Sequence, residues 1–462
     1  GVRDADSDGS EAEDAGAVSF HADRPELRPE RLPPPSRLIC TWADGCPQLS
    51  VYEKKRLKNI IENAKFFAAL ELYEVCMESE AKPKKAEDET VRRRSMRLQR
   101  VEPSGVSGLE APAQPTAAGS VRQVGVRGDV SVYTQKYQDM LSSMVLSKEN
   151  IRKVVKYRVC SMAIHPSESI LFVAAGDKSG QIGLWNDCKS EEGAHVFVPH
   201  NDLVSCMHFS PFNPAHLLSL SNDSLRCGDV TRAVFDDIYR SEEKLSSFDF
   251  LEDNASTAIV AHWGGNITVV DRRTPGTSSG LSADIDFKRM RTVHVHPVNK
   301  QYFMAAGLQD VCIYDIRYLK FHRNMPVSSL KGHTKSVASA FFSPVTGNRA
   351  VTVCADDKLR VYDTSSLSSK VEVLSTIRHN NNTGRWLSRF QAIWDPKQED
   401  CFVVGSMLQP RQIEVFQDTG KLLHSFSNLN CLNSVCSINV VHPTKNVLVG
   451  GNSSGRLHVF KD

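Results

Sequence analysis

The sequence predicts an all-β fold, a seven-bladed β-propeller over residues 151–462, preceded by a partly disordered N-terminal extension that carries one or two helices. Three observations lead to this prediction. A pattern of three apolar strands separated by turns is repeated seven times from about Arg158 onward. Each copy has turn residues in similar places, and a strand-like segment precedes the first copy. A repeat of this length indicates a ring of similar small sheets.

The repeat is clearest at the end of the third strand of each copy, where an aliphatic or aromatic residue usually precedes a polar one. These ends recur roughly every 42 to 54 residues, close to the period of a WD40 blade. They read Trp185-Asn186, Gly228-Asp229, Val270-Asp271, Tyr314-Asp315, Tyr362-Asp363, Phe416-Gln417 and Phe460-Lys461.

Prolines mark the turn after the first strand in six of the seven copies. Proline has no N–H for the sheet ladder, so it ends a strand rather than continuing it. The third copy lacks the proline and has residues 250–254 in its place. The histidines of the His-Pro pairs are interpreted as turn residues. The six turns are His165-Pro166, Ser210-Pro211, His296-Pro297, Ser343-Pro344, Asp395-Pro396 and His442-Pro443.

The seventh copy has three strands, and an open last blade would leave an unpaired edge. Residues 151–155, Ile-Arg-Lys-Val-Val, have the length and composition of a strand. We therefore expect them to pair with the last blade and close the ring. On this scheme, removal of residues 1–155 lowers stability, whereas removal of residues 1–145 does not.

In the N-terminal extension, polar segments alternate with segments whose apolar residues recur at helical spacing. Residues 1–48, an acidic and proline-rich tail, and residues 81–130, a basic linker, cannot bury a core and are predicted to be disordered. Within the linker, residues 92–100 are rich in arginine. They are either a solvated linker, or a nuclear import signal or phosphate-binding arm. The chain has a net charge of only +2, because the negative charge of the acidic tail offsets the positive charge of the remainder.

Two segments of the extension have helical periodicity. Residues 49–80 are predicted to form an amphipathic helix, with Leu57, Ile60, Ile61 and Phe67 on one side. Residues 131–150 are predicted to contain a short helix that leads into the propeller. Such helices either pack back on their own propeller or enter a groove of a partner.

The twelve cysteines form no Cys-x-x-Cys pair. Cys40 and Cys46 lack the second pair that a zinc site needs, so we expect reduced thiols and no metal or other cofactor. Reduced thiols indicate the nucleus or cytosol. We find no secretory signal and no apolar run long enough to cross a bilayer, and therefore expect no membrane partner.

The sequence contains none of the catalytic motifs that we sought: no Gly-x-Ser-x-Gly, no His-Glu-x-x-His and no phosphate-cradling glycine loop. A propeller of this type is normally a binding platform, although fold alone does not define function. We therefore do not expect an enzyme.

Propeller geometry sorts the charged residues between two faces. The top rim consists of the loops that lead into each first strand and those between second and third strands. A ring of cations there would follow a phosphate backbone, and the alternative is scattered solubilising charge. The predicted DNA-binding residues of the top rim are Arg158, Lys178, Lys288, Arg289, Arg291, Lys335, Arg385, Trp386 and Arg389.

One top-rim loop, residues 379–390, lengthens the sixth copy and is rich in asparagine. Its Trp386 lies between Arg385 and Arg389 in sequence. An aromatic residue between cations suits stacking on a base or insertion at a duplex step. The alternative is that Trp386 caps the propeller core.

The bottom face, where third strands end, carries two Asp-x-Arg sequences. These are Asp271-Arg272-Arg273 and Asp315-Ile316-Arg317. The pattern is short and by itself common at blade ends.

From about Leu49 to its end the sequence resembles the WD repeat-containing protein 76 family. The most specific stretches are residues 63–68 (Asn-Ala-Lys-Phe-Phe-Ala), 174–180 (Ala-Ala-Gly-Asp-Lys-Ser-Gly) and 379–387 (His-Asn-Asn-Asn-Thr-Gly-Arg-Trp-Leu). That family is similar to the small subunit of the damaged-DNA-binding complex. In this relative the top rim binds DNA, and a loop at the position of residues 384–386 enters the duplex at the lesion.

The resemblance implies a nuclear, chromatin-associated protein of the DNA damage response that binds double-stranded DNA, damaged or modified. It also implies a substrate receptor of a cullin-4 ubiquitin ligase. Asp271, Arg273, Asp315 and Arg317, with the N-terminal helices, would then bind the ligase's propeller adaptor.

Two departures from the relative limit this inference. It has Phe-Gln-His where this sequence has Gly384-Arg385-Trp386, so lesion recognition does not transfer. Tyr314 and Val270 replace the tryptophan that usually precedes Asp-x-Arg. The alternative function is a scaffold that binds histones or other peptides without direct DNA affinity.

Overall fold

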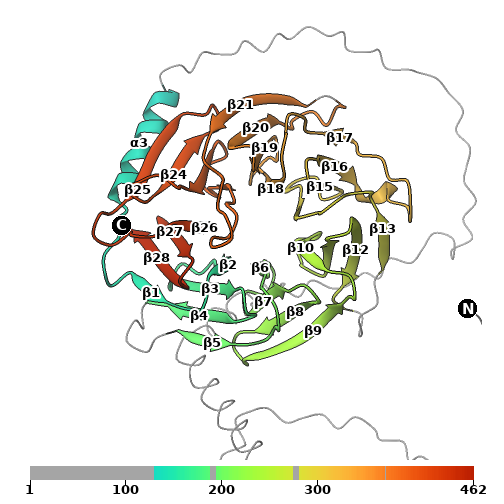
Figure 1. The fold of residues 1–462 in the computed structure, drawn as a ribbon, viewed down its shortest axis with the longest axis horizontal. Coiled ribbons are helices and arrows are strands. Elements are labelled where there is room, and N and C mark those ends of the chain that lie inside the picture. Colours follow the sequence, from blue (N-terminus) through green and yellow to red (C-terminus); the bar gives the residue numbers. More distant parts are fainter. Residues whose placement is uncertain (1–128, 188–193, 274–279, 370) are drawn as a thin grey trace, which may run out of the picture. The chain divides into compact units, whose positions relative to one another are not determined.

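The computed structural model describes residues 129–187, 194–273, 280–369 and 371–462. These residues form seven four-stranded antiparallel sheets around one axis (Figure 1), which confirms the seven-bladed propeller. The predicted helix of residues 49–80, the tail of residues 1–48 and all but the last two residues of the linker 81–130 lie outside the described residues.

In blades 1 to 4 the strands follow one another in chain order from the inner to the outer strand. Blade 1 holds β2 (Val159–Ile164), β3 (Phe172–Asp177), β4 (Ile182–Asn186) and β5 (His195–Phe197). Blade 2 holds β6 (Cys206–Phe209), β7 (His216–Leu220), β8 (Ser224–Asp229) and β9 (Val234–Arg240). Blade 3 holds β10 (Leu245–Phe250), β11 (Thr257–His262), β12 (Asn266–Asp271) and β13 (Leu281–Asp284). Blade 4 holds β14 (Thr292–Val295), β15 (Tyr302–Ala306), β16 (Val311–Asp315) and β17 (Ser328–Ser329), with the 3₁₀ helix η4 (Ile316–Tyr318) after β16.

The remaining three blades follow the same order, except that the outer strand of blade 7 comes first in the chain. Blade 5 holds β18 (Val337–Phe342), β19 (Arg349–Cys354), β20 (Lys358–Asp363) and β21 (Glu372–Arg378). Blade 6 holds β22 (Ile393–Trp394), β23 (Cys401–Gly405), β24 (Gln412–Gln417) and β25 (Leu422–Ser427). Blade 7 holds β26 (Cys436–Val441), β27 (Val447–Asn452), β28 (Arg456–Lys461) and β1 (Ile151–Lys153).

The sequence repeat predicted the ends of the third strands correctly. In every blade the predicted end of the third strand is the last residue of that strand, from Asn186 in β4 to Lys461 in β28. The second strands of most blades are buried on both faces, as in β3 and β23. Apolar side chains from neighbouring blades therefore fill the space between sheets, which holds the blades together.

The histidines of the His-Pro turns are confirmed as turn residues. The ring Nδ1 of His165 accepts a hydrogen bond from the Ser167 N–H at 3.1 Å. His442 Nδ1 accepts from the Lys445 N–H at 3.0 Å, while its Nε2 lies 3.0 Å from the Ser167 carbonyl oxygen of blade 1. The Nδ1 atoms of both rings thus accept hydrogen bonds from backbone N–H groups of their own turns. The Nε2 atom of His442 also contacts the neighbouring blade.

The segment before the first blade closes the ring, as predicted. Ile151 pairs with His458 and Lys153 with Arg456, antiparallel to β28. The strand is shorter than the predicted residues 151–155, because Val154 and Val155 leave the ladder and both direct their N–H groups to the Gly455 carbonyl. Their side chains are buried in the core between blades 7 and 1.

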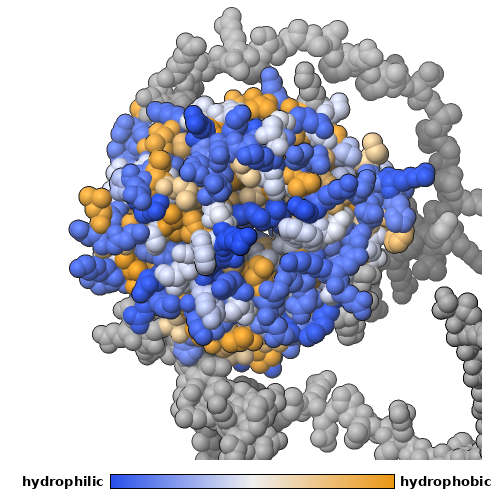
Figure 2. All heavy atoms as spheres, viewed as in Figure 1, coloured by the Kyte–Doolittle hydropathy of each residue, from blue (hydrophilic) through white to orange (hydrophobic). Residues whose placement is uncertain are grey.

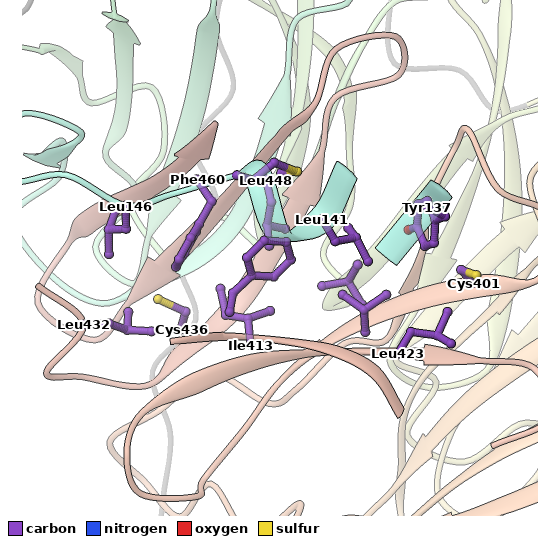
Figure 3. Packing of buried hydrophobic residues seen from close by; sticks show 14 residues of the cluster. Tyr137, Leu141, Leu146, Cys401, Ile413, Leu423, Leu432, Cys436, Leu448 and Phe460 are labelled. Carbon is purple, nitrogen blue, oxygen red and sulfur yellow. The ribbon is translucent and has the colours of Figure 1, made fainter. Parts of the chain in front are cut away.

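The helix before the propeller is present, with bounds that differ from the prediction. It is α3 (Asp129–Ser143), and residues 144–150 are irregular rather than helical. α3 packs on the outside of blades 6 and 7 through Tyr137 and Leu141 (Figure 3), and Met144, just after the helix, belongs to the same buried cluster. This packing argues against the expectation that residues 1–145 are dispensable for stability, because their removal would expose this part of the core.

The described part of the chain has two further general properties, which concern its cysteines and its helices. The cysteines among the described residues are free thiols. No helix that the structure describes has the length and apolar character needed to cross a membrane.

Candidate nucleic-acid interface

Strand direction alternates within each blade, so the loops divide between two faces. The connections from an outer strand to the next inner strand, and those from second to third strands, lie together on the top rim. All nine predicted DNA-binding residues fall on such connections. Arg158 precedes β2, Lys178 lies between β3 and β4, Lys288, Arg289 and Arg291 lie between β13 and β14, Lys335 precedes β18, and Arg385, Trp386 and Arg389 precede β22.

The top rim surrounds a cavity at the mouth of the central channel. Its volume is about 510 Å³, and all seven blades contribute to its wall at or just before their inner strands. Figure 2 shows one face of the propeller, with strongly hydrophilic residues around a hollow at its centre. We call this space the channel-mouth cavity. It is lined by the cationic residues Arg158, Lys244, Arg291, Arg385 and Arg389, by Trp263, and by polar residues that include Ser205, Asn222, Ser246, Ser388 and Gln391.

Four of the predicted residues therefore lie together on this cavity: Arg158, Arg291, Arg385 and Arg389. The other five lie on the top rim outside its lining. Lys178, Lys288, Arg289 and Lys335 are exposed there. The Lys178 Nζ lies 4.8 Å from the centroid of the Tyr157 ring, which suits a cation–π contact.

The loop between β21 of blade 5 and β22 of blade 6 reaches across the mouth to blade 1. Arg158 Nη1 donates a hydrogen bond to the Arg385 carbonyl at 2.6 Å, and the Ser388 hydroxyl donates to the Val159 carbonyl. At its other end Asn381 is bonded to Asp357 and Cys354 of blade 5. These contacts hold a long loop in one position over the channel.

Trp386 lies at the tip of this loop and is 84% exposed. It does not cap the propeller core, so that alternative is wrong. Gly384 has φ of +59° and open space around its Cα, which allows the tight turn that presents the ring. A large aromatic side chain held outward between two arginines is suited to stacking on a base.

The arginines of the loop lie near a third guanidinium. Desolvation by the surrounding wall lowers the pKa of Arg389, although its side chain remains exposed, and the charge of Arg158 lowers it further. The Arg158 Nε is buried without a hydrogen-bond partner in the structure. Two like charges held this close favour an anion between them.

Sequence reasoning did not select Trp263, and Lys244, a basic residue of the predicted top rim, was not among the predicted DNA-binding residues. Trp263 lies in the turn between β11 and β12, and the Arg291 guanidinium carbon lies 5.0 Å from the centroid of its ring. The Lys244 Nζ lies 5.8 Å from the same ring. The signal available in the sequence was an aromatic residue in a Gly-rich turn, Trp263-Gly264-Gly265. It was missed because the third copy is the least regular of the repeat.

The bottom face holds the other predicted set. Arg273 bonds both carboxylate oxygens of Asp271 through Nε and Nη2, and Arg317 bonds Asp315 in the same way, with Nη2···Oδ2 distances of 2.7 and 2.6 Å. The two arginine side chains are 67% and 57% exposed. The carboxylates therefore orient the guanidinium groups at the ends of β12 and β16, the third strands of two neighbouring blades.

Apolar side chains accompany this pair of arginines. In the loop from η4 to β17, Tyr318, Phe321 and Met325 are largely exposed. A pocket of about 180 Å³ beside Asp315 is lined by Tyr318 and Met325 among others. Exposed apolar groups around oriented arginines are typical of protein-binding surfaces.

No group of three histidine, cysteine, aspartate or glutamate side chains within the described ranges is placed to hold a metal ion. The channel-mouth cavity is built from cations, an aromatic ring and hydroxyl or amide groups, a chemistry that binds anions and planar bases. The bottom face instead combines arginine–aspartate pairs with apolar side chains.

Comparisons with known proteins agree with the architecture. The family model for the WD domain, G-beta repeat, matches residues 324–363, which include the three inner strands of blade 5. The chain is 50% identical to WD repeat-containing protein 76 of Rhinolophus ferrumequinum, over 90% of this chain and 74% of that protein. The corresponding protein of Xenopus laevis is 48% identical over 95% and 85%. DNA damage-binding protein cmr1 of Aspergillus oryzae is 25% identical over 66% and 65%.

Proposed function

This chain belongs to the WD repeat-containing protein 76 family, and on that premise we propose that it binds double-stranded DNA across its top rim. More distant relatives are named DNA damage-binding proteins. The observation that supports the proposal most strongly is the channel-mouth cavity, where four of the predicted arginines lie together. Lys178, Lys288, Arg289 and Lys335 extend the cationic surface outward over blades 1, 3–4 and 4–5.

In this arrangement the rim cations contact phosphates, and Trp386 contacts a base or a base step. Phosphate contacts position the protein without defining a sequence. The affinity gained from the aromatic contact depends on the free energy needed to unstack the base step. A duplex with damage that weakens base pairing opens more easily, so a preference for such DNA would come from Trp386 itself and not from the loop sequence of the relative.

The test is a titration of duplex binding against salt concentration. Each phosphate contact releases condensed counterions, so the logarithm of the affinity falls steeply with the logarithm of salt, and removing one contact lowers the slope by about one unit. Lys288→Ala and Lys335→Ala should each show this change. Lys421→Ala, at the bottom connection between β24 and β25, is the matched control. Equal slopes for all these folded variants would refute binding across the top rim.

We further propose that the bottom face binds the propeller adaptor of a cullin-4 ubiquitin ligase, which would place the protein in the nucleus among chromatin proteins. The oriented Arg273 and Arg317, with the exposed Tyr318 and Met325 beside them, support this proposal. The double variant Arg273→Ala/Arg317→Ala should capture the purified adaptor at least tenfold more weakly than wild type. Capture at wild-type strength would exclude these arginines as anchors.

The alternative, a scaffold for histone or other peptides, fits the top rim less well. Histone tails are basic, and the channel-mouth cavity is lined by cations with no aspartate or glutamate. Like charges across an interface oppose association. The salt titration distinguishes the two functions, because a scaffold without DNA affinity gives no duplex binding to titrate.

A further inference from the structure

The channel-mouth cavity has an unusual charge distribution. Five cationic side chains contribute to its lining, and no carboxylate does. Among the residues that the structure describes, no ion pair joins an aspartate or glutamate to Arg158, Lys244, Arg291, Arg385 or Arg389. Asp202, which accepts a hydrogen bond from the lining residue Asn222, is a nearby acid, and it lies outside the lining.

The hydrogen bonds of these cations leave most of their donors for a ligand. Arg158 is bonded through Nη1 to a backbone carbonyl and its Nε is buried, so its remaining guanidinium N–H groups are the donors that can meet a ligand. Arg291 Nε donates to the Ser336 hydroxyl at 3.1 Å. Arginine has five donors in a planar fork that matches phosphate. The cavity thus combines excess positive charge with unused donors.

We propose that the channel-mouth cavity binds a terminal phosphate of a DNA strand, a phosphomonoester, rather than a phosphodiester of continuous duplex. The inference rests on the proposed function and names a second ligand group at the same face. A phosphomonoester has a second pKa near 6 and carries about −1.5 to −2 charges at pH 7. An internal phosphodiester carries one. The dianion is the better match for an acid-free cluster of five cations.

The size of the cavity supports the same choice. A space of about 510 Å³ can hold one nucleotide, whereas a duplex is too wide to enter it. A continuous duplex would rest on the rim above the cavity. A strand end can place its last nucleotide inside, with the phosphate between Arg158 and Arg389 and the base towards Ser246 and Asn222, whose side chains can hydrogen-bond to it.

The experiment compares three DNA ligands of the same sequence at one salt concentration: a covalently closed dumbbell without ends, a duplex with 5′-hydroxyl ends and a duplex with 5′-phosphate ends. For the wild-type protein we expect the 5′-phosphate duplex to bind about tenfold more tightly than the 5′-hydroxyl duplex, because charge-assisted hydrogen bonds to a dianion are gained. Thymidine 5′-monophosphate should compete away this additional affinity.

The variants distinguish binding of the terminal phosphate in the cavity from binding of DNA on the surrounding rim. Arg158→Gln/Arg389→Gln should reduce the ratio between the two linear duplexes to about one. Arg389→Gln alone should reduce it in part, and this change removes no hydrogen bond or ion pair within the described part of the chain. Lys288→Gln/Arg289→Gln removes the same charge outside the cavity. It should weaken all three ligands and leave the ratio unchanged. Melting curves confirm that each variant is folded.

Several results would overturn the inference. A wild-type ratio of one would refute the terminal-phosphate site, yet salt-dependent dumbbell binding would leave the proposed function intact. Loss of the ratio in the rim variant would mean that the phosphate lies outside the cavity. A phosphoserine peptide that competes as well as thymidine 5′-monophosphate would assign the cavity to phosphoproteins instead. Failure of the dumbbell to bind would refute the proposed function itself.

Discussion

The phenolic hydroxyl of Tyr137 in α3 donates a hydrogen bond to Asp395 Oδ2 at 2.7 Å, joining residues 258 positions apart. Asp395 is the turn residue of blade 6 and also receives the Lys397 Nζ at 3.1 Å. Burial of the Tyr137 ring, together with the neighbouring Asp395 charge, raises the pKa of the phenol far above its usual range. The helix before the propeller is therefore fastened to a blade turn through a buried polar contact.

The first prediction concerns this contact. Tyr137→Phe removes the donor and leaves part of a buried carboxylate unsatisfied, so the free energy of unfolding should fall by about 1–3 kcal/mol. Tyr133→Phe is the control, because Tyr133 on the same helix is 72% exposed. Urea unfolding followed by tryptophan fluorescence measures both. Equal losses for the two variants would mean that the Tyr137 bond contributes nothing specific.

The second prediction concerns closure of the ring. A chain that begins at residue 129 should melt like the full chain, because α3 and β1 are kept. A chain that begins at residue 144 should melt at a lower temperature, since Tyr137 and Leu141 no longer cover blades 6 and 7. A chain that begins at residue 156 should be the least stable, because β28 then has an unpaired edge. Any other order of melting temperatures contradicts this account of closure.

The third prediction separates stacking from charge at the top rim. Trp386→Ala should weaken duplex binding by about 1–3 kcal/mol and leave the salt slope unchanged, because an aromatic side chain releases no counterions. Trp386→Phe should restore much of the affinity. A lower salt slope in Trp386→Ala would show instead that the loop, with Arg385, had moved away from the phosphates.

The fourth prediction concerns pH. Burial, with Arg226 nearby, lowers the pKa of His200 to about 4, and its Nε2 lies 2.8 Å from the Ser219 hydroxyl. Between pH 4 and about 6.5 the unfolded chain binds a proton there that the native protein does not. The free energy of unfolding therefore decreases as the pH falls from about 6.5 to 4.

His200→Gln removes this titration and can keep a bond to Ser219. The loss of stability between pH 7 and pH 5 should be smaller in the variant by about 2 kcal/mol, from the pKa difference of roughly 1.5 units that is crossed. Urea unfolding at the two pH values measures it. An unchanged loss would mean that His200 is not the titrating group.

The proposed contacts with DNA and with the adaptor involve different parts of the molecule. Variants of the top rim, such as Lys288→Ala, leave Arg273 and Arg317 in place on the bottom face. The two activities should therefore be separable by mutation, which allows each proposal to fail without the other.

The sequence by itself determined the ring. A period of about 42 to 54 residues, prolines after first strands and polar third-strand ends placed all seven third strands correctly, because these are local signals of turn and strand chemistry. The same repeat places Arg158, Arg291, Arg385 and Arg389 on the top rim. It also assigned Asp271 and Asp315 to the bottom face.

Tertiary structure alone decided what these residues form together. Lys244 and Arg291 meet at the Trp263 ring through contacts between neighbouring loops. The loop of Trp386 is joined to blade 1 by hydrogen bonds from the Arg158 guanidinium to the Arg385 carbonyl and from the Ser388 hydroxyl to the Val159 carbonyl. The bond from Tyr137 to Asp395 likewise joins distant parts of the chain. Such contacts depend on how loops and helices meet after the ring closes, and a periodic pattern carries no information about them. Repetition defines the blades, whereas the site depends on the irregular segments between them.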